Sequence, residues 1–182
     1  MTPSLLALLL ASGLSPGETL AVDPAASALR YHVVHKLHRV DGETRSIEGR
    51  AAVKPDGTLQ AMVRAAVASF RSGESNRDAH MEETLETGRF PFVTFRGVAR
   101  LGPDLQVPLS LAMDGEVELH GARRPVRVTL AAERQPDGAF RVRTSFEVSL
   151  DAFGIDRPSL LFVKIEDACR IDVDLLLREE HR

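Results

Sequence analysis

Cysteine, tryptophan and tyrosine are almost missing from this chain of 182 residues. It contains one cysteine, no tryptophan and one tyrosine. The single cysteine, Cys169, excludes an intramolecular disulfide and any metal site built from several cysteines. Export does not require disulfides, so the cysteine count leaves the cellular compartment open.

The chain also lacks an excess of positive charge. Lysine and arginine total 23 against 26 aspartates and glutamates, which gives a net charge of −3. Proteins that hold nucleic acid or an anionic membrane surface normally present a basic field, so we expect neither as a partner. The sequence has no P-loop, Rossmann glycine pattern, zinc-type Cys/His spacing or G-x-S-x-G motif. We therefore expect no metal and no cofactor.

Long hydrophobic runs are missing as well. The apolar run Leu5 to Ala11 is far shorter than the roughly 20 residues of a transmembrane helix, so no transmembrane segment is expected. It precedes turn-forming residues and then Thr19 and Ala21, which are small residues at positions −3 and −1 of a cleavage site. The pattern predicts a signal peptide over residues 1–21, cut after Ala21 or near Gly13.

This prediction has one feature against it, because no lysine or arginine precedes Arg30. The alternative is a disordered N-terminus on a cytosolic protein. With cleavage, residues 22–182 form one mature domain in the periplasm or outside the cell, a length suited to a single hydrophobic core.

From Ser27 onward, apolar and polar residues alternate with a period of two, which is typical of strands with one buried face. We expect about eight strands, the first running from Ser27 through His38. Pro55-Asp56-Gly57 and Pro136-Asp137-Gly138 are turn signals between strands. The short turns favour sequential antiparallel pairing.

Eight antiparallel strands form either a sandwich or a closed barrel, and closure removes exposed edges. The inward-facing rows contain many small residues such as Ala61, Val63 and Ala65, which favours a barrel with room for one ligand. The expected fold class is therefore an all-β, eight-stranded antiparallel barrel with one short helix in a loop. Asp78 is the expected cap of that helix and Gly88 its expected end.

Three histidines invite a metal-site interpretation that strand geometry weakens. His32 and His38, six residues apart in one strand, would be about 20 Å apart. His35 faces inward in this pattern, where it contacts either a ligand head group or a buried structural partner. Cys169 falls in an inward apolar row, where burial makes a thiol inert.

The densest polar cluster is the loop from Ser72 to His80, which leads into the expected helix. Its serine, histidine and aspartate do not establish a catalytic triad, which requires a specific spatial order and an oxyanion hole. We expect Arg77 and Asp78 to form an ion pair that pins the loop. Contact between this loop and a ligand is the alternative.

Several motifs, in this order, resemble the YceI-like family of lipocalin-like, polyisoprenoid-binding proteins. The match covers about Ser27 to Leu177. Its most specific parts are Ser27-x-Leu29-x-Tyr31-x-Val33-x-His35, Ala68-Ser69-Phe70-x-Ser72-Gly73, Asn76-Arg77-Asp78-x-His80-Met81, Phe90-Pro91-x-Val93-Thr94-Phe95, Met113-Asp114-Gly115-Glu116-Val117-Glu118-Leu119-His120-Gly121 and Leu150-Asp151-x-Phe153-Gly154-Ile155.

The resemblance implies a periplasmic barrel with an elongated hydrophobic tunnel for isoprenoid or fatty chains, and no established catalytic mechanism. We expect a protein that binds, sequesters or transports a long-chain amphiphile, such as an isoprenoid, a quinone or a fatty-acyl lipid, and not an enzyme. The expected entrance loop contains Arg77, Asp78 and His80. The expected lumen residues are Tyr31, Val33, His35, Val63, Val67, Phe95, Met113, Val117, Val142 and Phe146.

Two alternatives stay open. One is an enzyme on the same scaffold, with His35 or His80 as a general base on a bound amphiphile. The other is a stress or interaction module whose barrel is filled by side chains. A homodimer is compatible with the sequence, although no sequence feature supports it.

Overall fold

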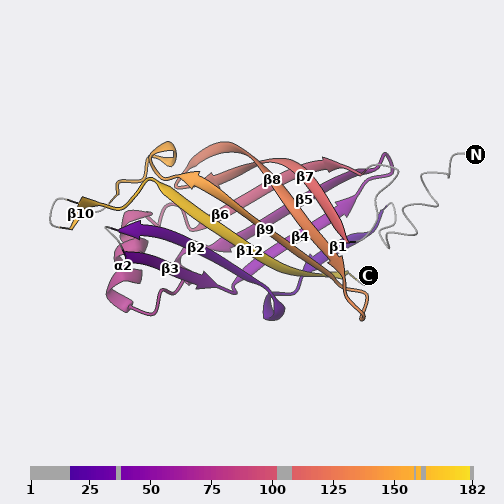
Figure 1. The fold of residues 1–182 in the computed structure, drawn as a ribbon, viewed down its shortest axis with the longest axis horizontal. Helices are drawn as coiled ribbons and strands as arrows, with labels where there is room; N and C mark the ends of the chain where they lie inside the picture. The colour runs from indigo at the N-terminus through magenta and orange to yellow at the C-terminus, as the bar shows by residue number, and fades with distance from the viewer. Residues whose placement is uncertain (1–16, 36–37, 102–107, 158, 161–162, 181–182) are drawn as a thin grey trace, which may run out of the picture.

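Antiparallel strands dominate the computed structural model, which describes residues 17–35, 38–101, 108–157, 159–160 and 163–180. Eight strands follow one another in the order β1, β4, β5, β6, β7, β8, β9, β12, and β1 pairs with β12 to close the ring (Figure 1). The expected eight-stranded antiparallel barrel is confirmed, as is the helix in a loop. The alternative of a sandwich is wrong.

The elements of the described chain have the following bounds. The strands are β1 (Thr19–Val22), β2 (Ala28–His35), β3 (His38–Thr44), β4 (Ile47–Val53), β5 (Thr58–Ala66), β6 (Phe92–Arg100), β7 (Leu109–Leu119), β8 (Ala122–Arg134), β9 (Phe140–Ser149), β10 (Ser159–Leu160), β11 (Val163–Lys164) and β12 (Ala168–Glu179). The α-helix is α2 (Ser75–Thr84), and the 3-10 turns are η1 (Pro24–Ala26), η2 (Val67–Ser69) and η3 (Asp151–Phe153).

The long strand β12 joins two parts of the barrel. It pairs with β1 near its C-terminal end and with β2 over Arg170–Asp174. The turn η1 separates β1 from β2, because Asp23 caps it and a proline opens it. Strands β1 and β2 thus pair with the same edge of β12, one after the other along its length. On their other edges, β1 pairs with β4 and β2 pairs with β3.

The expected single strand from Ser27 through His38 is wrong. The chain reverses between His35 and His38, which are paired across the β2–β3 hairpin. His32 therefore faces Asp41 on β3, and the expected separation of His32 and His38 along one strand does not apply. Alternation continues on both sides of a tight hairpin, so periodicity alone does not reveal such a turn.

Helix α2 begins before Asp78, contrary to the expected cap. Glu74 occupies the N-cap position without a side-chain hydrogen bond, and Leu85 is the C-cap, ahead of Gly88. Asp78 is buried in the first turn of the helix, where a carboxylate is favourable. Met81 and Leu85 pack against two hydrophobic clusters, so α2 lies at one end of the barrel (Figure 1).

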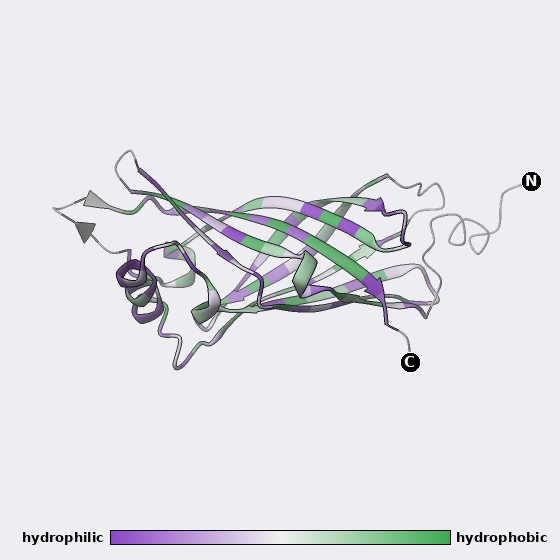
Figure 2. Cartoon of the chain, turned by 90° about the horizontal axis from the view of Figure 1, so that it is seen from below, coloured by the Kyte–Doolittle hydropathy of each residue, from purple (hydrophilic) through white to green (hydrophobic). Residues whose placement is uncertain are grey.

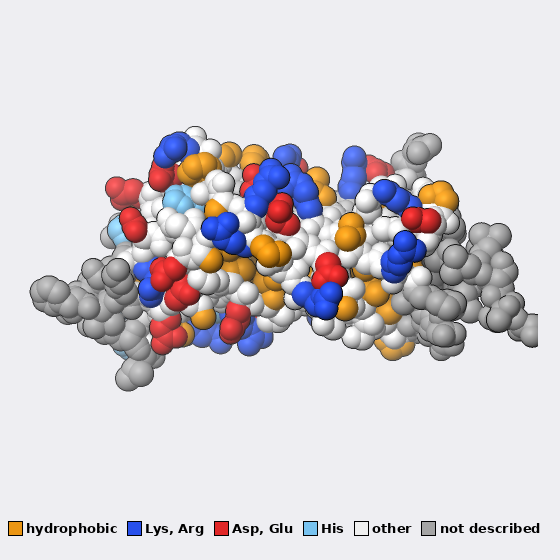
Figure 3. All heavy atoms as spheres, turned by 90° about the horizontal axis from the view of Figure 1, so that it is seen from above, with side chains coloured by type: hydrophobic (Ala, Val, Ile, Leu, Met, Phe, Trp, Pro, Cys, Tyr) orange, Lys and Arg blue, Asp and Glu red, His pale blue; other side chains and the backbone are white. Residues whose placement is uncertain are grey.

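Figure 2 shows apolar and polar residues alternating along the barrel strands. Basic and acidic side chains lie interspersed on the outer face drawn in Figure 3. Many charged side chains of the described residues form ion pairs, such as Arg127 with Asp114 and Arg123 with Glu118. No helix among the described residues is long and apolar enough to cross a membrane.

Candidate functional site

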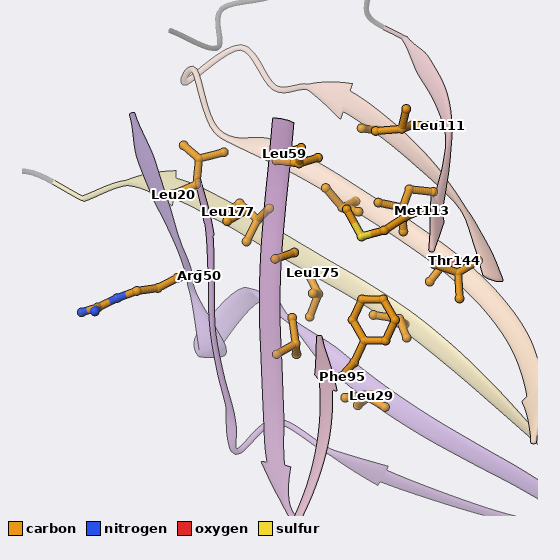
Figure 4. A pocket seen from close by; sticks show the side chains of 18 of the residues that line it. Leu20, Leu29, Arg50, Leu59, Phe95, Leu111, Met113, Thr144, Leu175 and Leu177 are labelled. Carbon is orange, nitrogen blue, oxygen red and sulfur yellow. The ribbon is translucent and has the colours of Figure 1, made fainter. Parts of the chain in front are cut away.

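The barrel encloses a cavity of about 180 Å³ that draws its walls from most of the strands (Figure 4). Its lining residues are the inward-facing members of each alternating row. They are Leu20, Leu29, Ala51, Val53, Leu59, Ala61, Val63, Phe70, Val93, Phe95, Leu101, Leu109, Leu111, Met113, Val117, Leu119, Val128, Leu130, Ala132, Phe140, Val142, Thr144, Phe146, Val148, Ile171, Val173, Leu175 and Leu177. Three charged residues, Glu18, Arg50 and Arg64, also belong to the lining.

The cavity wall is almost entirely apolar. The hydroxyl of Thr144 donates to the backbone oxygen of Thr129 at 2.8 Å, so this polar atom is already satisfied. Arg50 points away from the apolar side chains, and its guanidinium lies 2.7 Å from Glu180 (Figure 4). Arg64 lies 2.6 Å from Glu48 on the outer face. A buried unpaired charge costs free energy, and these pairs keep both cations out of the cavity.

Two glycines opposite each other shape the wall between β6 and β7. Gly97 pairs with Gly115, and the ring of Phe95 lies where their side chains would be. A Cβ atom on Gly97 would lie 2.6 Å from the Phe95 ring, as would one on Gly115. The glycines therefore let the ring lie against the wall instead of across the cavity.

The structure places six of the ten expected lumen residues on the cavity wall and four elsewhere. The six are Val63, Phe95, Met113, Val117, Val142 and Phe146. The expected rows were correct for β5, β6, β7 and β9, because one strand register fixes every inward residue on a strand. Whether these side chains contact a ligand stays a prediction.

The other four expected lumen residues do not line the cavity. The ring of Tyr31 packs against Phe70, with centroids 5.7 Å apart, and Phe70 itself is the wall residue. Val33 and His35 lie toward the end of β2, where the hairpin with β3 continues beyond the cavity. Val67 is buried in η2, where the chain has left β5. Alternation continues along β2 and up to η2 beyond the part of each segment that lines the cavity, so it does not show where the lining ends.

Sequence reasoning also missed wall residues that its own rows contained. Leu59, Leu111 and Leu130 line the cavity, as do Val173 and Leu175 on β12. Each occupies an alternating inward position, so the signal was present. Alternation shows which residues of a strand face inward, but only the register between strands shows which of these lie level with the cavity.

The polar loop before α2 is held by Ser72. The backbone N–H of Ser72 donates to the Asp78 carboxylate at 2.9 Å, and its hydroxyl also binds that carboxylate. Arg77 donates to the Ser72 hydroxyl and to its backbone oxygen, both at 2.9 Å. Arg77 and Asp78 therefore do not form the expected ion pair with each other; each of them binds Ser72 instead.

His80, which the enzyme alternative names as a general base, takes no part in the hydrogen bonds of this network. Its side chain is 59% exposed, with Glu83 at 3.9 Å. It does not line the cavity. The loop thus has a packing role in the structure, and its expected contact with a ligand stays a prediction.

The remaining chemical candidates lie outside the cavity. His32 is held on the outer wall between Asp41 at 2.6 Å and Asp172 at 2.9 Å. Among the described residues, no three His, Cys, Asp or Glu side chains are grouped to hold a metal ion. Burial raises the pKa of Cys169 to about 12, so its thiol is protonated at neutral pH.

Solved structures with the same fold confirm the architecture. BcnA of Burkholderia cenocepacia is 16% identical with a TM-score of 0.73, covering 85% of this chain and 98% of its own. A polyisoprenoid binding domain from Saccharophagus degradans is 15% identical with a TM-score of 0.70, covering 88% and 98%. A YCEI protein of Campylobacter jejuni is 12% identical with a TM-score of 0.63, covering 81% and 88%.

No curated protein matches the sequence. The sequence model of the YceI-like domain, however, matches residues 20–177, which is nearly the whole described barrel from β1 to the end of the cavity wall on β12. The chain therefore belongs to the YceI-like family.

Proposed function

We propose that this protein binds the apolar chain of an amphiphile, of isoprenoid, quinone or fatty-acyl type, inside the barrel, and sequesters or carries it. The observation that carries the proposal is the enclosed cavity, whose wall is almost entirely apolar. An apolar enclosure inside a polar shell has no structural necessity, since natural cores are normally filled to close packing.

The size of the hydrophobic effect agrees with this proposal. Burial of each methylene contributes about 0.8 kcal/mol, so ten would contribute roughly 8 kcal/mol before the costs of ordering and association. Affinity would come from the tail. The Saccharophagus degradans relative, named as a polyisoprenoid binding domain, supports an isoprenoid chain as the first candidate.

Binding is favoured over catalysis by the composition of the wall. The described residues that line the cavity include no serine, cysteine, histidine or lysine. The two histidines of the enzyme alternative, His35 and His80, both lie outside it. The filled-barrel alternative is less favoured because the side chains of the barrel interior leave a cavity between them.

Native mass spectrometry of the purified protein, followed by organic extraction, tests the proposal. We expect a stoichiometric apolar adduct, or uptake of an offered polyprenol, quinone or fatty acid. Leu111→Trp should abolish uptake, because the larger side chain projects from the wall and fills the cavity. Val98→Trp should leave uptake unchanged, because Val98 is 48% exposed on the outer face of β6. A clean apo mass with no uptake would contradict the proposal.

Export to the periplasm belongs to the same proposal. Thr19–Val22 form β1, which closes the barrel, and Leu20 is buried. Of the two expected cleavage positions, the one near Gly13 keeps β1 whole, whereas cleavage after Ala21 would remove most of it. The mass of the protein recovered from the periplasm tests this. A retained Met1 in that fraction would contradict processing.

A further inference from the structure

Strands β8 and β9 are joined over only part of their length. Four residue pairs link them, from Ala131 with Arg143 to Arg134 with Phe140. On its other edge, β8 pairs with β7 from Ala122 through Ala132. The first two-thirds of β8 and the last part of β9 therefore have no ladder between them, and the two strands diverge there (Figure 1).

Pro125 removes one main-chain donor from the edge of β8 that faces β9. His120 and Gly121 have φ values of 50° and 73°, as in a two-residue type I′ hairpin between β7 and β8. Leu119 and Ala122 flank this turn as a hydrogen-bonded pair, and the alternation of an antiparallel ladder then turns the backbone nitrogen of Pro125 toward β9. Proline has no N–H to donate.

The same alternation turns the backbone oxygen of Thr129 toward β9, where it accepts the Thr144 hydroxyl. A side chain thus takes the place of the main-chain donor at the point where the ladder ends. This contact supports the assigned alternation independently of the turn.

A side pocket of about 250 Å³ lies in the opening. Two of its wall residues, Val117 and Val148, also line the main cavity, so the two spaces adjoin. The remaining wall comes from both strands and from the turn η3. The full lining is Val117, Arg124, Pro125, Val126, Glu147, Val148, Ser149, Ala152 and Phe153.

Arg124 is the unusual member of this lining. It pairs with Val117 and therefore belongs to the inward row of β8, which continues through apolar Val126 and Val128. Its side chain is exposed at the opening, where Nη1 donates to the Arg123 backbone oxygen at 2.8 Å. No carboxylate of the described chain forms an ion pair with it. Its outward neighbours on the same strand, Arg123 and Arg127, both have carboxylate partners.

We propose that the opening between β8 and β9 is a lateral mouth of the cavity, and that Arg124 binds the anionic head group of an amphiphile there. The head group is a carboxylate or a phosphate, which guanidinium recognises through paired hydrogen bonds. The tail passes between Val117 and Val148 into the main cavity. This inference rests on the proposed function, because it needs a tail in the barrel.

Charge selectivity tests the role of Arg124. Hexadecanoate and hexadecanol have the same tail, so the ratio of their dissociation constants isolates the head group. We expect the native protein to prefer the acid by at least about tenfold. Arg124→Gln should remove the preference by weakening only the acid, and Arg127→Gln, on the outer face, should leave it intact. Hexadecyl phosphate, offered beside hexadecanoate, tells which anion is preferred.

The outcomes separate this inference from the function on which it rests. Equal binding of acid and alcohol by the native protein, or an unchanged preference in Arg124→Gln, overturns the anion site and leaves lipid binding standing. Failure of both tails to bind overturns the proposed function, and the mouth with it.

The absence of tryptophan in the chain allows a direct test of the position of the head group. In Glu147→Trp, an indole stands at the edge of the side pocket, while Val98→Trp places one on the outer face of β6 as the control. A fatty acid brominated near its carboxylate should quench the first indole more strongly than one brominated near its methyl end. The reverse order would overturn the lateral mouth.

Discussion

At the scale of single residues, the buried thiol of Cys169 has a chemistry set by its surroundings. It is 5% exposed on β12, and burial raises its pKa to about 12 from an ordinary value of 9.0. The raised pKa means that the folded state favours the neutral thiol. This contribution to stability is complete below pH 9 and is lost as the pH rises toward 12.

We therefore expect Cys169 to resist thiol reagents in the folded protein at about pH 8, since the thiolate is the reactive form. The rate of reaction with a chromogenic disulfide should rise steeply in concentrated urea. Rapid modification of the folded protein would contradict the assigned burial.

His32 offers a second test at this scale. The hydrogen bond from His32 holds the pKa of the Asp41 carboxyl below its ordinary value, with Arg39 contributing. In His32→Leu we expect the Asp41 pKa to rise toward 3.8, as measured by NMR titration of the carboxyl carbon. Asp114 is the internal control, because Arg127 lowers its pKa and His32 lies elsewhere. An unchanged Asp41 value would mean that Arg39 carries the effect.

At the scale of elements, the glycine pair on β6 and β7 makes the clearest prediction. Gly115→Ala would place a Cβ atom 2.6 Å from both the Arg96 backbone oxygen and the Phe95 ring. Because backbone cannot move aside easily, we expect a loss of about 1–3 kcal/mol in the free energy of unfolding. Gly88→Ala is the matched control, since no atom lies within 4 Å of its added methyl. Urea denaturation of both variants measures the difference.

Elements also show where sequence reasoning succeeds and where it stops. The alternating rows predicted which face of β5, β7 and β9 lies inside, because a strand has only two faces. They did not reveal the reversal after His35 or the start of β1 at Thr19. Both depend on pairing with distant strands, and Thr19 lay within a segment that otherwise reads as a signal peptide.

The lateral opening illustrates the same limit. Pro125 is visible in the sequence. Its lack of a backbone N–H matters only because the register of the β7–β8 hairpin turns its nitrogen toward β9. Arg124 is one of two adjacent arginines in the sequence. Its inward position follows from its pairing with Val117, which no local pattern specifies.

At the scale of the whole molecule, acid should weaken the barrel. Arg178 on β12 lies 3.0 Å from Asp23 and 2.8 Å from Asp137, and its hydrogen bonds lower the pKa of both carboxyls. A lowered pKa in the folded state gives stability that is present above the unfolded value of about 3.9 and lost as the pH falls through the folded value.

We accordingly expect the melting temperature to hold between about pH 5 and 7 and to fall steeply below about pH 4. Arg178→Gln should flatten the acid part of this profile, because the side-chain hydrogen bond that most lowers the pKa of each carboxyl is then lost. Circular dichroism melting curves across the pH range measure it. A profile of unchanged steepness would assign the acid sensitivity to other carboxylates.

The closure of the ring by β1 and β12 has a consequence for how the chain folds. Leu20 is paired with Glu179, so closing the barrel joins segments from opposite ends of the described sequence. Contacts this distant are slow to form, since the intervening chain must first lose its freedom. The ring cannot be completed until β12 is available to pair with β1. Until then both flanking edges stay open to other chains, and the yield of folded protein depends on how long that interval lasts.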